Sequence, residues 1–237
     1  MKSKLIPDGT GRDQIRRPPP KSLAELKIRA EALAGRSVRE LATGLGFVVP
    51  EDNVRSKGFV GQLVEYALGA DPSAGELPDF TGLEVELKTI PVRPNGAPIE
   101  STFCCSIAMD KADRETWEMS RLKRRLTRVL WLPVDGSSVA SMPERCFGRA
   151  RLWQPEDEEL EVLRADWEDL MGAIGSGRGG TLSAREGEVL QVRPKAANSH
   201  ARTVSPGGGG FEMSLPLGFY MRAGTTARIL EHGTIIE

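Results

Sequence analysis

The stretch PDFTGLEVELKT, from Pro78 to Thr89, holds the change of pattern that decides the fold. Its Pro-Asp pair predicts a turn, and the residues after the turn alternate between apolar and polar with the period of a β-strand. Leucine and valine side chains would line one face of this strand, and Glu84, Glu86 and Lys88 the other. We therefore expect a strand with an apolar inner face and an unusually charged outer face.

Helical signals come before this stretch. The capping-box spacing Ser-x-x-Glu occurs at Ser22 and at Ser37, and apolar residues at helical spacing follow each serine. The segment FVGQLVEYAL, residues 59–68, has an apolar stripe and is followed by Gly69, a residue typical of helix C-termini. Three helices are therefore predicted in the N-terminal part of the chain.

Strand and helix signals alternate after the stretch. Strands are predicted at residues 101–109, 129–134 and 188–194, and helices at about 115–126 and from Pro155 onward. Residues 175–180 are predicted to be a flexible connector, and the SPGGGG run at 205–210 a loop. Helices followed by a mixed central sheet with flanking helices indicate an α/β fold.

The N-terminal segment differs from the rest of the chain in composition and periodicity. Residues 1–21 contain five basic residues between Lys2 and Arg17 and a run of three prolines, and they show no hydrophobic periodicity. We interpret them as a disordered or extended basic leader. The folded domain is then residues 22–237.

The composition limits the classes of protein to which the chain can belong. With 237 residues and a net charge of -1, it can form one large or two small domains, and it has no overall positive field to attract nucleic acid. Cys104, Cys105 and Cys146 make an odd number, which favours reduced cytosolic thiols over a disulfide framework. No apolar run is long enough to span a membrane and no signal peptide is visible, so a cytoplasmic protein is expected.

The charged face of the predicted strand could form a catalytic metal site. Glu86 and Lys88 leave the same face, and Asp79 lies at the turn that enters the strand. If the turn brings Asp79 beside Glu86, the two carboxylates repel each other unless a cation such as Mg²⁺ neutralises them. A lysine next to that metal can orient a water molecule and stabilise charge on a phosphate. The alternative is an ordinary half-exposed strand with a solvated polar face.

Other polar residues have two interpretations each. Glu65 lies beside the apolar stripe of its helix and is either a solvent-exposed glutamate or a further carboxylate that reaches the metal. Residues 121–128 hold five basic residues, which form either a solvated helix face or a phosphate-contacting patch. The segment RPKAAN at 193–198 is either a polar loop or a set of side chains that read base edges.

Several ordered segments together resemble the MutH family of DNA mismatch-repair endonucleases, over about residues 22–237. The segments are RSKGFVGQLVEYALGA, DFTGLEVELKTIPV, ESTF, TWE, RVLWLPV, RLWQP, ADWEDLM, LQVRPKAAN and LPLGFY. This family is related in fold to type II restriction endonucleases. The resemblance therefore implies a restriction-endonuclease-like fold with two subdomain arms that grip DNA in a cleft.

The resemblance implies an active site. Asp79, Glu86 and Lys88 match the family's Asp…Glu-x-Lys pattern. In that pattern Asp79 and Glu86 would hold Mg²⁺, with the Leu87 carbonyl as a further ligand, and Lys88 would position the attacking water. Glu65 matches an additional catalytic carboxylate on the preceding helix.

The resemblance also implies DNA-contacting residues. Those that match the family's recognition positions and a DNA-contacting loop are Lys57, Gly58, Arg193, Pro194, Lys195 and Tyr220. Lys195 would read a base, and Tyr220 would sense adenine methylation. Arg125 stands where close family members carry a lysine near the active site, and it keeps the charge but not the donor geometry.

The implied activity is Mg²⁺-dependent nicking of the unmethylated strand, 5′ to the G of hemimethylated GATC sites. The implied protein is a nucleoid-associated monomer, activated by MutL, which MutS engages. A GATC-specific restriction-type endonuclease is an alternative, but it would need two active sites for a double cut. A non-cleaving reader of GATC methylation and a structural α/β domain are the alternatives from other classes.

Overall fold

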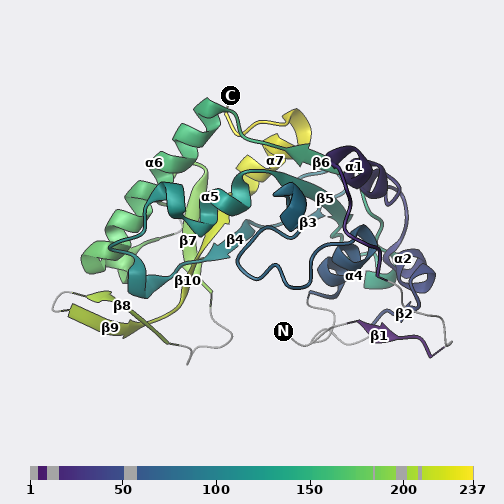
Figure 1. Ribbon diagram of the computed structural model, residues 1–237, viewed down its shortest axis with the longest axis horizontal. Coiled ribbons are helices and arrows are strands. Elements are labelled where there is room, and N and C mark those ends of the chain that lie inside the picture. Colours follow the sequence, from purple (N-terminus) through teal and green to yellow (C-terminus); the bar gives the residue numbers. More distant parts are fainter. Residues whose placement is uncertain are drawn as a thin grey trace. The chain divides into compact units, whose positions relative to one another are not determined.

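The computed structural model describes residues 5–9, 16–50, 58–183, 185–195, 202–207 and 210–236. The chain divides into two compact units. The first unit consists of Met1–Ile99 and Arg128–Trp153, and the second of Glu100–Thr127 and Gln154–Glu237. Both units contain helices and β-sheet, so the predicted α/β class is confirmed (Figure 1).

The three predicted N-terminal helices form in the first unit. They are α1 (Leu23–Glu31), α2 (Val38–Gly44) and α4 (Phe59–Leu68). The Ser22 hydroxyl accepts a hydrogen bond from a backbone N–H in the first turn of α1, and both halves of the capping box are present at Ser37. Gly69 ends α4 in the left-handed conformation, with φ of 84°.

A mixed sheet in the first unit carries the charged stretch. Strand β3 (Glu86–Val92) pairs in parallel with β5 (Val129–Asp135), and β5 pairs in the antiparallel sense with β6 (Arg151–Trp153). The register places Leu87 beside Leu130, and Lys88 beside Trp131. Because neighbours on paired strands share a face, the leucines lie on one face of the sheet and Lys88 and Trp131 on the other.

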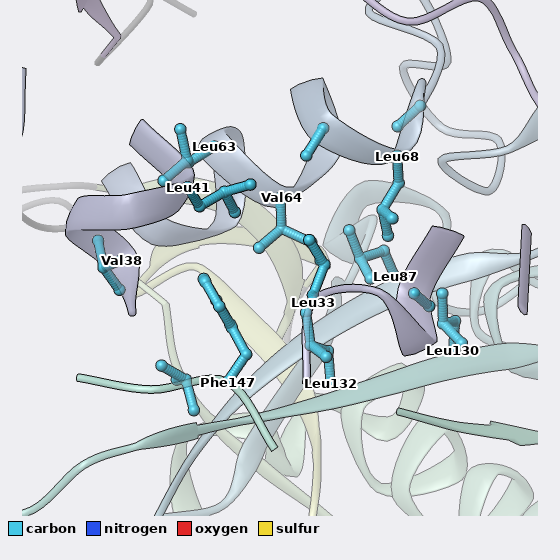
Figure 2. Packing of buried hydrophobic residues seen from close by; sticks show 14 of the residues in the cluster. Leu33, Val38, Leu41, Leu63, Val64, Leu68, Leu87, Leu130, Leu132 and Phe147 are labelled. Atoms are coloured by element: carbon cyan, nitrogen blue, oxygen red, sulfur yellow. The ribbon is translucent and has the colours of Figure 1, made fainter. Parts of the chain in front are cut away.

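The core of the first unit packs α4 against the leucine face of this sheet. Figure 2 shows the buried side chains, which include Leu33, Val38, Leu41, Leu63, Val64, Leu68, Leu87, Leu130, Leu132 and Phe147. Gly61 of α4 approaches β3 closely, since a Cβ added there would lie 3.6 Å from Thr89 Oγ1. The helix that carries Glu65 is therefore fixed directly on the strand that carries Glu86 and Lys88.

The charged stretch differs from the prediction in two respects. The strand begins at Glu86, because Thr81–Leu83 form a 3₁₀ turn and Glu84 adopts a left-handed conformation with φ of 54°. Glu86 also does not lie on a solvated face, since its exposed fraction is 1%. An ordinary wet strand face is therefore the wrong interpretation for Glu86, because a buried carboxylate requires compensation.

The second unit contains a three-stranded antiparallel sheet. Strand β10 (Leu217–Met221) lies in the middle, between β4 (Thr102–Ser106) and β7 (Leu190–Pro194). The expected mixed central sheet is thus divided between the units, and among the described strands the parallel pair lies in the first.

A separate hairpin in the second unit corrects a loop prediction. Strands β8 (Thr203–Gly207) and β9 (Gly210–Ser214) pair with each other in the antiparallel sense (Figure 1). The glycine-rich run at 205–210 therefore lies largely in strands. Glycine has a low strand propensity, so the pattern contained no strand signal there.

The helices of the second unit are α5 (Arg121–Leu126), α6 (Asp157–Ala173) and α7 (Ala223–His232). The helix predicted from about residue 115 starts later, because the Ser120 hydroxyl caps α5 by accepting from the Lys123 N–H at 3.1 Å. A separate 3₁₀ turn, Trp117–Met119, precedes the cap. Pro155 likewise lies just outside α6, whose N-terminal cap is Glu156.

Helical turns replace the connector predicted at 175–180. A π-helical turn, Ile174–Arg178, follows α6, and a 3₁₀ turn, Gly179–Thr181, follows that. Within the described ranges, no helix is both long and apolar enough to cross a membrane.

Part of the predicted leader belongs to the first unit. Strand β1 (Ile6–Pro7) pairs with β2 (Phe47–Val48) in the antiparallel sense. Closer to α1, the Arg29 Nη1 donates to the Pro18 carbonyl at 2.7 Å. Residues 5–9 and 16–21 are therefore defined parts of the fold, and the other leader residues lie outside the described ranges.

Candidate active site and DNA-recognition surface

A tight loop brings Asp79 back to the start of β3. The Phe80 N–H donates to the Val85 carbonyl at 2.9 Å, which closes the loop between them. Asp79 Oδ2 then accepts a hydrogen bond from the Leu87 N–H at 2.8 Å. The carboxylate of Asp79 is thus fixed at the edge of β3, next to the residue that follows Glu86, as the turn predicted.

Glu86 and Lys88 form a buried ion pair on β3. Lys88 Nζ lies 2.6 Å from Glu86 Oε1, and the two side chains are 12% and 1% exposed, respectively. Desolvating two charges costs free energy that their attraction repays only in part, so such a pair is a poor means of stabilising a fold. Its presence favours a functional role for the two residues.

Asp79 is electrostatically unfavourable at neutral pH. Burial, together with the nearby Glu86 charge, raises the pKa of Asp79 to about 6, although the Leu87 N–H and the Lys88 charge act in the opposite direction. The fold therefore holds two carboxylates close together at a cost in free energy. A divalent cation between them would remove that cost.

Glu65 of α4 belongs to the same group of charges. Burial raises the pKa of Glu65, and the Glu86 charge also raises it, whereas Arg16 and Lys88 lower it. Glu65 is therefore a partly buried neighbour of the β3 charges, which contradicts the alternative of a fully exposed helical glutamate. The structure brings together all four residues predicted to be catalytic.

The donor atoms at this site suit Mg²⁺. Asp79 and Glu86 offer carboxylate oxygens, and the Leu87 carbonyl points to the Asp79 side of β3, because the N–H and C=O of one strand residue point the same way. Among the described residues, no group of three or more His, Cys, Asp or Glu side chains could by itself hold a metal ion. Mg²⁺ does not need such a cage, since it keeps several waters and binds through one or two carboxylates plus substrate phosphates.

The predicted base-reading residues lie at the end of β7 in the second unit. Arg193, Pro194 and Lys195 are exposed. The Lys195 backbone N–H donates to the Pro216 carbonyl at 2.7 Å, and its Nζ lies 4.1 Å from the centroid of the Phe103 ring. Lys195 is therefore anchored at its backbone and stacked at its charged end, which reduces the entropy lost on binding.

Tyr220 lies beside the same ring, on the middle strand of the sheet. Its ring packs edge-on against Phe103, with 5.3 Å between centroids, and the Arg193 guanidinium lies 5.7 Å from the Tyr220 centroid. Arg193 Nη1 also donates to Ser101 Oγ at 2.9 Å. The structure thus joins three predicted recognition residues, Arg193, Lys195 and Tyr220, into one aromatic and cationic platform.

Gly218 makes the contact between Lys195 and Phe103 sterically feasible. A Cβ on Gly218 would lie 2.9 Å from Phe103 Cε2 and 3.4 Å from Lys195 Cβ. A side chain here would push the two residues apart, so we assign Gly218 a positioning role in the platform.

The remaining predicted DNA contacts belong to different units. Gly58 is the exposed N-terminal cap of α4, with φ of 83°, and Lys57 lies outside the described residues. Arg125 lies on α5 of the second unit, where it and Arg124 add to the effect of burial in lowering the pKa of Arg121. The predicted basic patch is therefore a true concentration of positive charge.

Comparison with known proteins identifies the family. Residues 68–166 match the family model described as DNA mismatch repair enzyme MutH. The chain is 45% identical over 213 residues to the DNA mismatch repair protein MutH of Shewanella sp. (strain W3-18-1), which covers 90% of this chain and 96% of that protein. The corresponding protein of Vibrio parahaemolyticus serotype O3:K6 is 45% identical over 215 residues, covering 90% and 95%. The chain belongs to the MutH family.

Membership of the MutH family confirms three expectations from the sequence. The chain is a DNA mismatch-repair protein, it is a DNA-cleaving hydrolase, and its mixed α/β structure agrees with the restriction-endonuclease-like fold expected for MutH. The roles of its individual residues stay predictions, which the geometry above makes specific.

Sequence reasoning missed one residue beside the candidate MutH active site. Arg16 Nε and Nη2 donate to the Ala70 carbonyl at 3.1 and 2.5 Å, and the guanidinium lies 5.5 Å from the centroid of the Tyr66 ring. Gly69 permits this approach, since a Cβ there would lie 2.5 Å from the Pro18 carbonyl oxygen. Nothing in an aperiodic leader signalled that one of its arginines would hold the end of α4.

Phe103 was also missed as an individual residue. It lies within the family segment ESTF, but a single aromatic residue in a strand is most simply a core residue. Its partner Lys195 is far away in sequence, so their stacking becomes visible only in the folded sheet.

Proposed function

We propose that this MutH-family chain is a Mg²⁺-dependent endonuclease that nicks the unmethylated strand of hemimethylated GATC sites, 5′ to the G. The observation that carries the proposal is the grouping of Asp79, Glu86 and Lys88 at the start of β3, where charge is buried at a cost in free energy. Sites with that property are typical of catalysis.

Each residue of the group has a distinct role in the proposed reaction. Asp79 and Glu86, with the Leu87 carbonyl, would hold Mg²⁺, which when bound supplies a Lewis acid for the scissile phosphate. Lys88 Nζ, oriented by its bond to Glu86, holds the attacking water in line and stabilises the negative charge that develops on the phosphate. Glu65, whose pKa is raised, is placed to accept a proton from that water.

Sequence specificity is assigned to the platform in the second unit. Arg193 and Lys195 are exposed, and their side chains carry donors suited to guanine O6 and N7. Tyr220 lies next to both through Phe103 and Arg193, where an adenine methyl group would change the local packing. This supports methylation sensing by Tyr220.

The proposed partners follow from the same role. Double-stranded DNA with GATC sites is the substrate, MutL is the activator and MutS acts indirectly through MutL. A monomer with one active site cuts one strand, which agrees with nicking. We further propose that the protein works in the cytoplasm, associated with the nucleoid.

A strand-resolved cleavage assay tests the proposal. A plasmid with one GATC site would be prepared in unmethylated, hemimethylated and fully methylated forms, and each would be incubated with Mg²⁺ in the presence and absence of MutL. Slow nicking restricted to unmethylated strands and accelerated by MutL is the expected result. Nicking that ignores methylation would contradict the role of Tyr220, and activity that survives EDTA would contradict the metal site.

The same assay separates the alternatives. Rapid double-strand cutting without MutL would identify a restriction-type enzyme. Specific binding to GATC without cleavage of any form would identify a methylation reader. The complete set of Asp79, Glu86 and Lys88 argues against a reader, because binding alone needs no buried carboxylate pair.

A further inference from the structure

An open cavity of about 490 Å³ lies at the N-terminal end of α7 in the second unit. Its lining is polar and basic, and comprises Ser101, Glu188, Gln191, Arg193, Arg222, Ala223, Gly224, Thr225 and Arg228. Of these residues, only Arg193 belongs to the aromatic and cationic platform.

Backbone donors point out of the helix at this cavity. Arg222 is the N-terminal cap of α7 and makes no side-chain capping bond. The first N–H that bonds back into the helix is that of Thr226, to the Arg222 carbonyl at 2.9 Å. The N–H groups of the first three helical residues have no intrahelical partner by geometry, and the helix dipole adds partial positive charge there. Helix starts of this kind bind phosphate and other anions.

The space in front of these donors is accessible. A Cβ built on Gly224, the second residue of α7, meets no atom within 4 Å. A ligand can therefore approach the backbone at this point without displacing a side chain. Gly224 also has no left-handed φ, so its lack of a side chain is not required by the backbone conformation.

The charges around the cavity are mostly positive and are held in place. Arg222 donates to the Gly187 carbonyl through Nε at 3.1 Å, and Arg228 Nη1 donates to the Ile235 carbonyl at 2.7 Å. With Arg193 they place three positive charges around the cavity against the single negative charge of Glu188. Carbonyl oxygens carry no net charge, so these hydrogen bonds hold the guanidinium groups in place and leave their positive charge intact. The groups are therefore preorganised for an anion.

Thr225 provides a second and independent indication of a ligand. It lines the cavity, its exposed fraction is only 4%, and within the described residues its hydroxyl makes no hydrogen bond. The hydroxyl oxygen is not itself enclosed by protein atoms, so its hydrogen-bonding capacity is open to the cavity. An anion at the helix start would accept from it.

We propose that this cavity binds a phosphate group of the DNA backbone, through the first N–H groups of α7, the Thr225 hydroxyl, Arg222 and Arg228. The proposal deepens the proposed function, because it assumes that the chain binds DNA. A backbone phosphate carries no sequence information, so the cavity contributes affinity and register while the base contacts contribute specificity. The same chemistry would suit free inorganic phosphate, and the test separates the two sources.

The test is Gly224→Asp, which places a carboxylate where the phosphate would lie. The change removes a glycine from a helix and puts an acidic side chain near the helix start, so the thermal midpoint should rise. Affinity for a short duplex of scrambled sequence, measured without Mg²⁺ at low salt, should nevertheless fall by about tenfold, and the salt slope should fall by about one. A structural role for this helix start predicts that stability and DNA affinity change together, not in opposite directions.

Two further variants isolate the cause. Gly172→Asp introduces the same charge on α6, at a glycine of the same unit that is also open to solvent, and should change affinity by less than about twofold. Gly224→Asn matches the size of aspartate without its charge and should lose much less affinity than Gly224→Asp. Equal losses in Gly224→Asp and Gly172→Asp would overturn the proposal, because general charge repulsion would then explain both.

Thermal melts with inorganic phosphate identify the source of the ligand. If phosphate, compared with chloride at equal ionic strength, raises the midpoint of wild type but not of Gly224→Asp, the cavity binds phosphate groups. If that occurs while DNA affinity is the same in both proteins, the DNA assignment is wrong and the cavity takes free phosphate. All these measurements use scrambled DNA without metal, so they remain decisive even if the GATC nicking activity proposed above fails its own test.

Discussion

The two units carry their charged residues in opposite ways. In the first unit, Glu86 is 1% exposed and is held by Lys88, while Asp79 has a pKa raised to about 6. In the second unit, Arg193 and Lys195 are exposed and lie over aromatic rings. Burying charge in the first region lowers the stability of the fold, whereas the charged groups of the second region stay exposed to water.

Under the proposed function, this difference separates chemistry from recognition. Groups that act on a phosphate gain strength when water is excluded, because electrostatic interactions are stronger in a medium of low polarity. Groups that find a DNA groove need to be reachable and already oriented, which a ring beneath a cation provides at little cost. Substitutions in the first region should therefore change rates and stability, and those in the second should change affinity.

The largest effect is expected for Lys88→Ala. Removing Nζ should lower the nicking rate by at least about 100-fold, because it removes a charge that acts on the developing negative charge. DNA binding should change little, since Lys88 is buried beside Glu86. Strand-resolved nicking and a gel-shift assay would measure the two effects.

Lys27→Ala, at an exposed lysine of α1, is the matched control. Circular dichroism would check folding, since Lys88→Ala leaves Glu86 without its cation. An unchanged nicking rate in a folded Lys88→Ala protein would exclude Lys88 from catalysis.

Asp79→Asn should inactivate the enzyme and stabilise the fold. The pKa of Asp79 is about 6 in the folded chain and ordinarily 3.8, so the folded state binds this proton more tightly. The free energy of unfolding therefore falls as pH rises from about 4 to about 6, by at most about 3 kcal/mol. Asparagine does not ionise, so it avoids this loss of stability, and its side-chain oxygen can still accept a hydrogen bond from the Leu87 N–H.

Denaturant melts in EDTA between pH 4 and pH 8 would measure this effect. The variant and wild type should have similar stability near pH 4, and the variant should be more stable above pH 6. Asp71→Asn is the control with the opposite sign, because hydrogen bonds from Ser73 lower the pKa of Asp71. A wild-type protein more stable than Asp79→Asn at pH 8 would show that the carboxylate is not destabilised by burial.

Lys195→Ala should act on affinity alone. The loss of a base contact is expected to cost about 1–3 kcal/mol in binding to GATC duplexes, with a much smaller loss on scrambled DNA. Lys111→Ala, at an exposed lysine of the same unit, should lose little on either. Equal losses on both duplexes would mean that Lys195 contacts only phosphate.

The smallest effect is expected for Arg16→Ala. The variant loses two hydrogen bonds to the Ala70 carbonyl and the contact with the Tyr66 ring, which together are worth about 1–2 kcal/mol of stability. Because Arg16 holds the end of the helix that carries Glu65, kcat should fall several-fold while KM for DNA stays constant.

Arg17→Ala, at the exposed neighbour, is the control for this change. Arg16→Lys should restore part of kcat, since it keeps the charge without the two-pronged geometry. A rise in KM at constant kcat would assign Arg16 to DNA binding.

The sequence predicted what local chemistry determines. Ser37 and Gly69 set helix ends through bonds and backbone angles within a few residues, so their patterns were sufficient. The return of Asp79 to β3 was also foreseeable, because Leu87, which donates to Asp79, follows it by only eight positions. The roles of these residues came instead from the resemblance to the MutH family.

The burial of Glu86 could not be predicted in this way. Alternation of apolar and polar residues tells which residues share a face, but not which face the rest of the chain covers. The strand boundary failed for a related reason, because Glu84 takes a left-handed conformation that its residue type does not favour. Arg16 and Phe103 depend on partners distant in sequence, for which a single chain gives no signal.

The route of the chain between β3 and β5 has a consequence for folding. These parallel neighbours are joined through residues 100–127, which belong to the second unit. A parallel pair is usually joined by one helix that packs on its own sheet. Here the loop that must close when β3 pairs with β5 includes residues 100–127, which pack in the other unit. The entropy cost of closing this loop should make the pairing late and slow. Neither unit is therefore an uninterrupted stretch of the chain, so neither can be produced by a simple truncation.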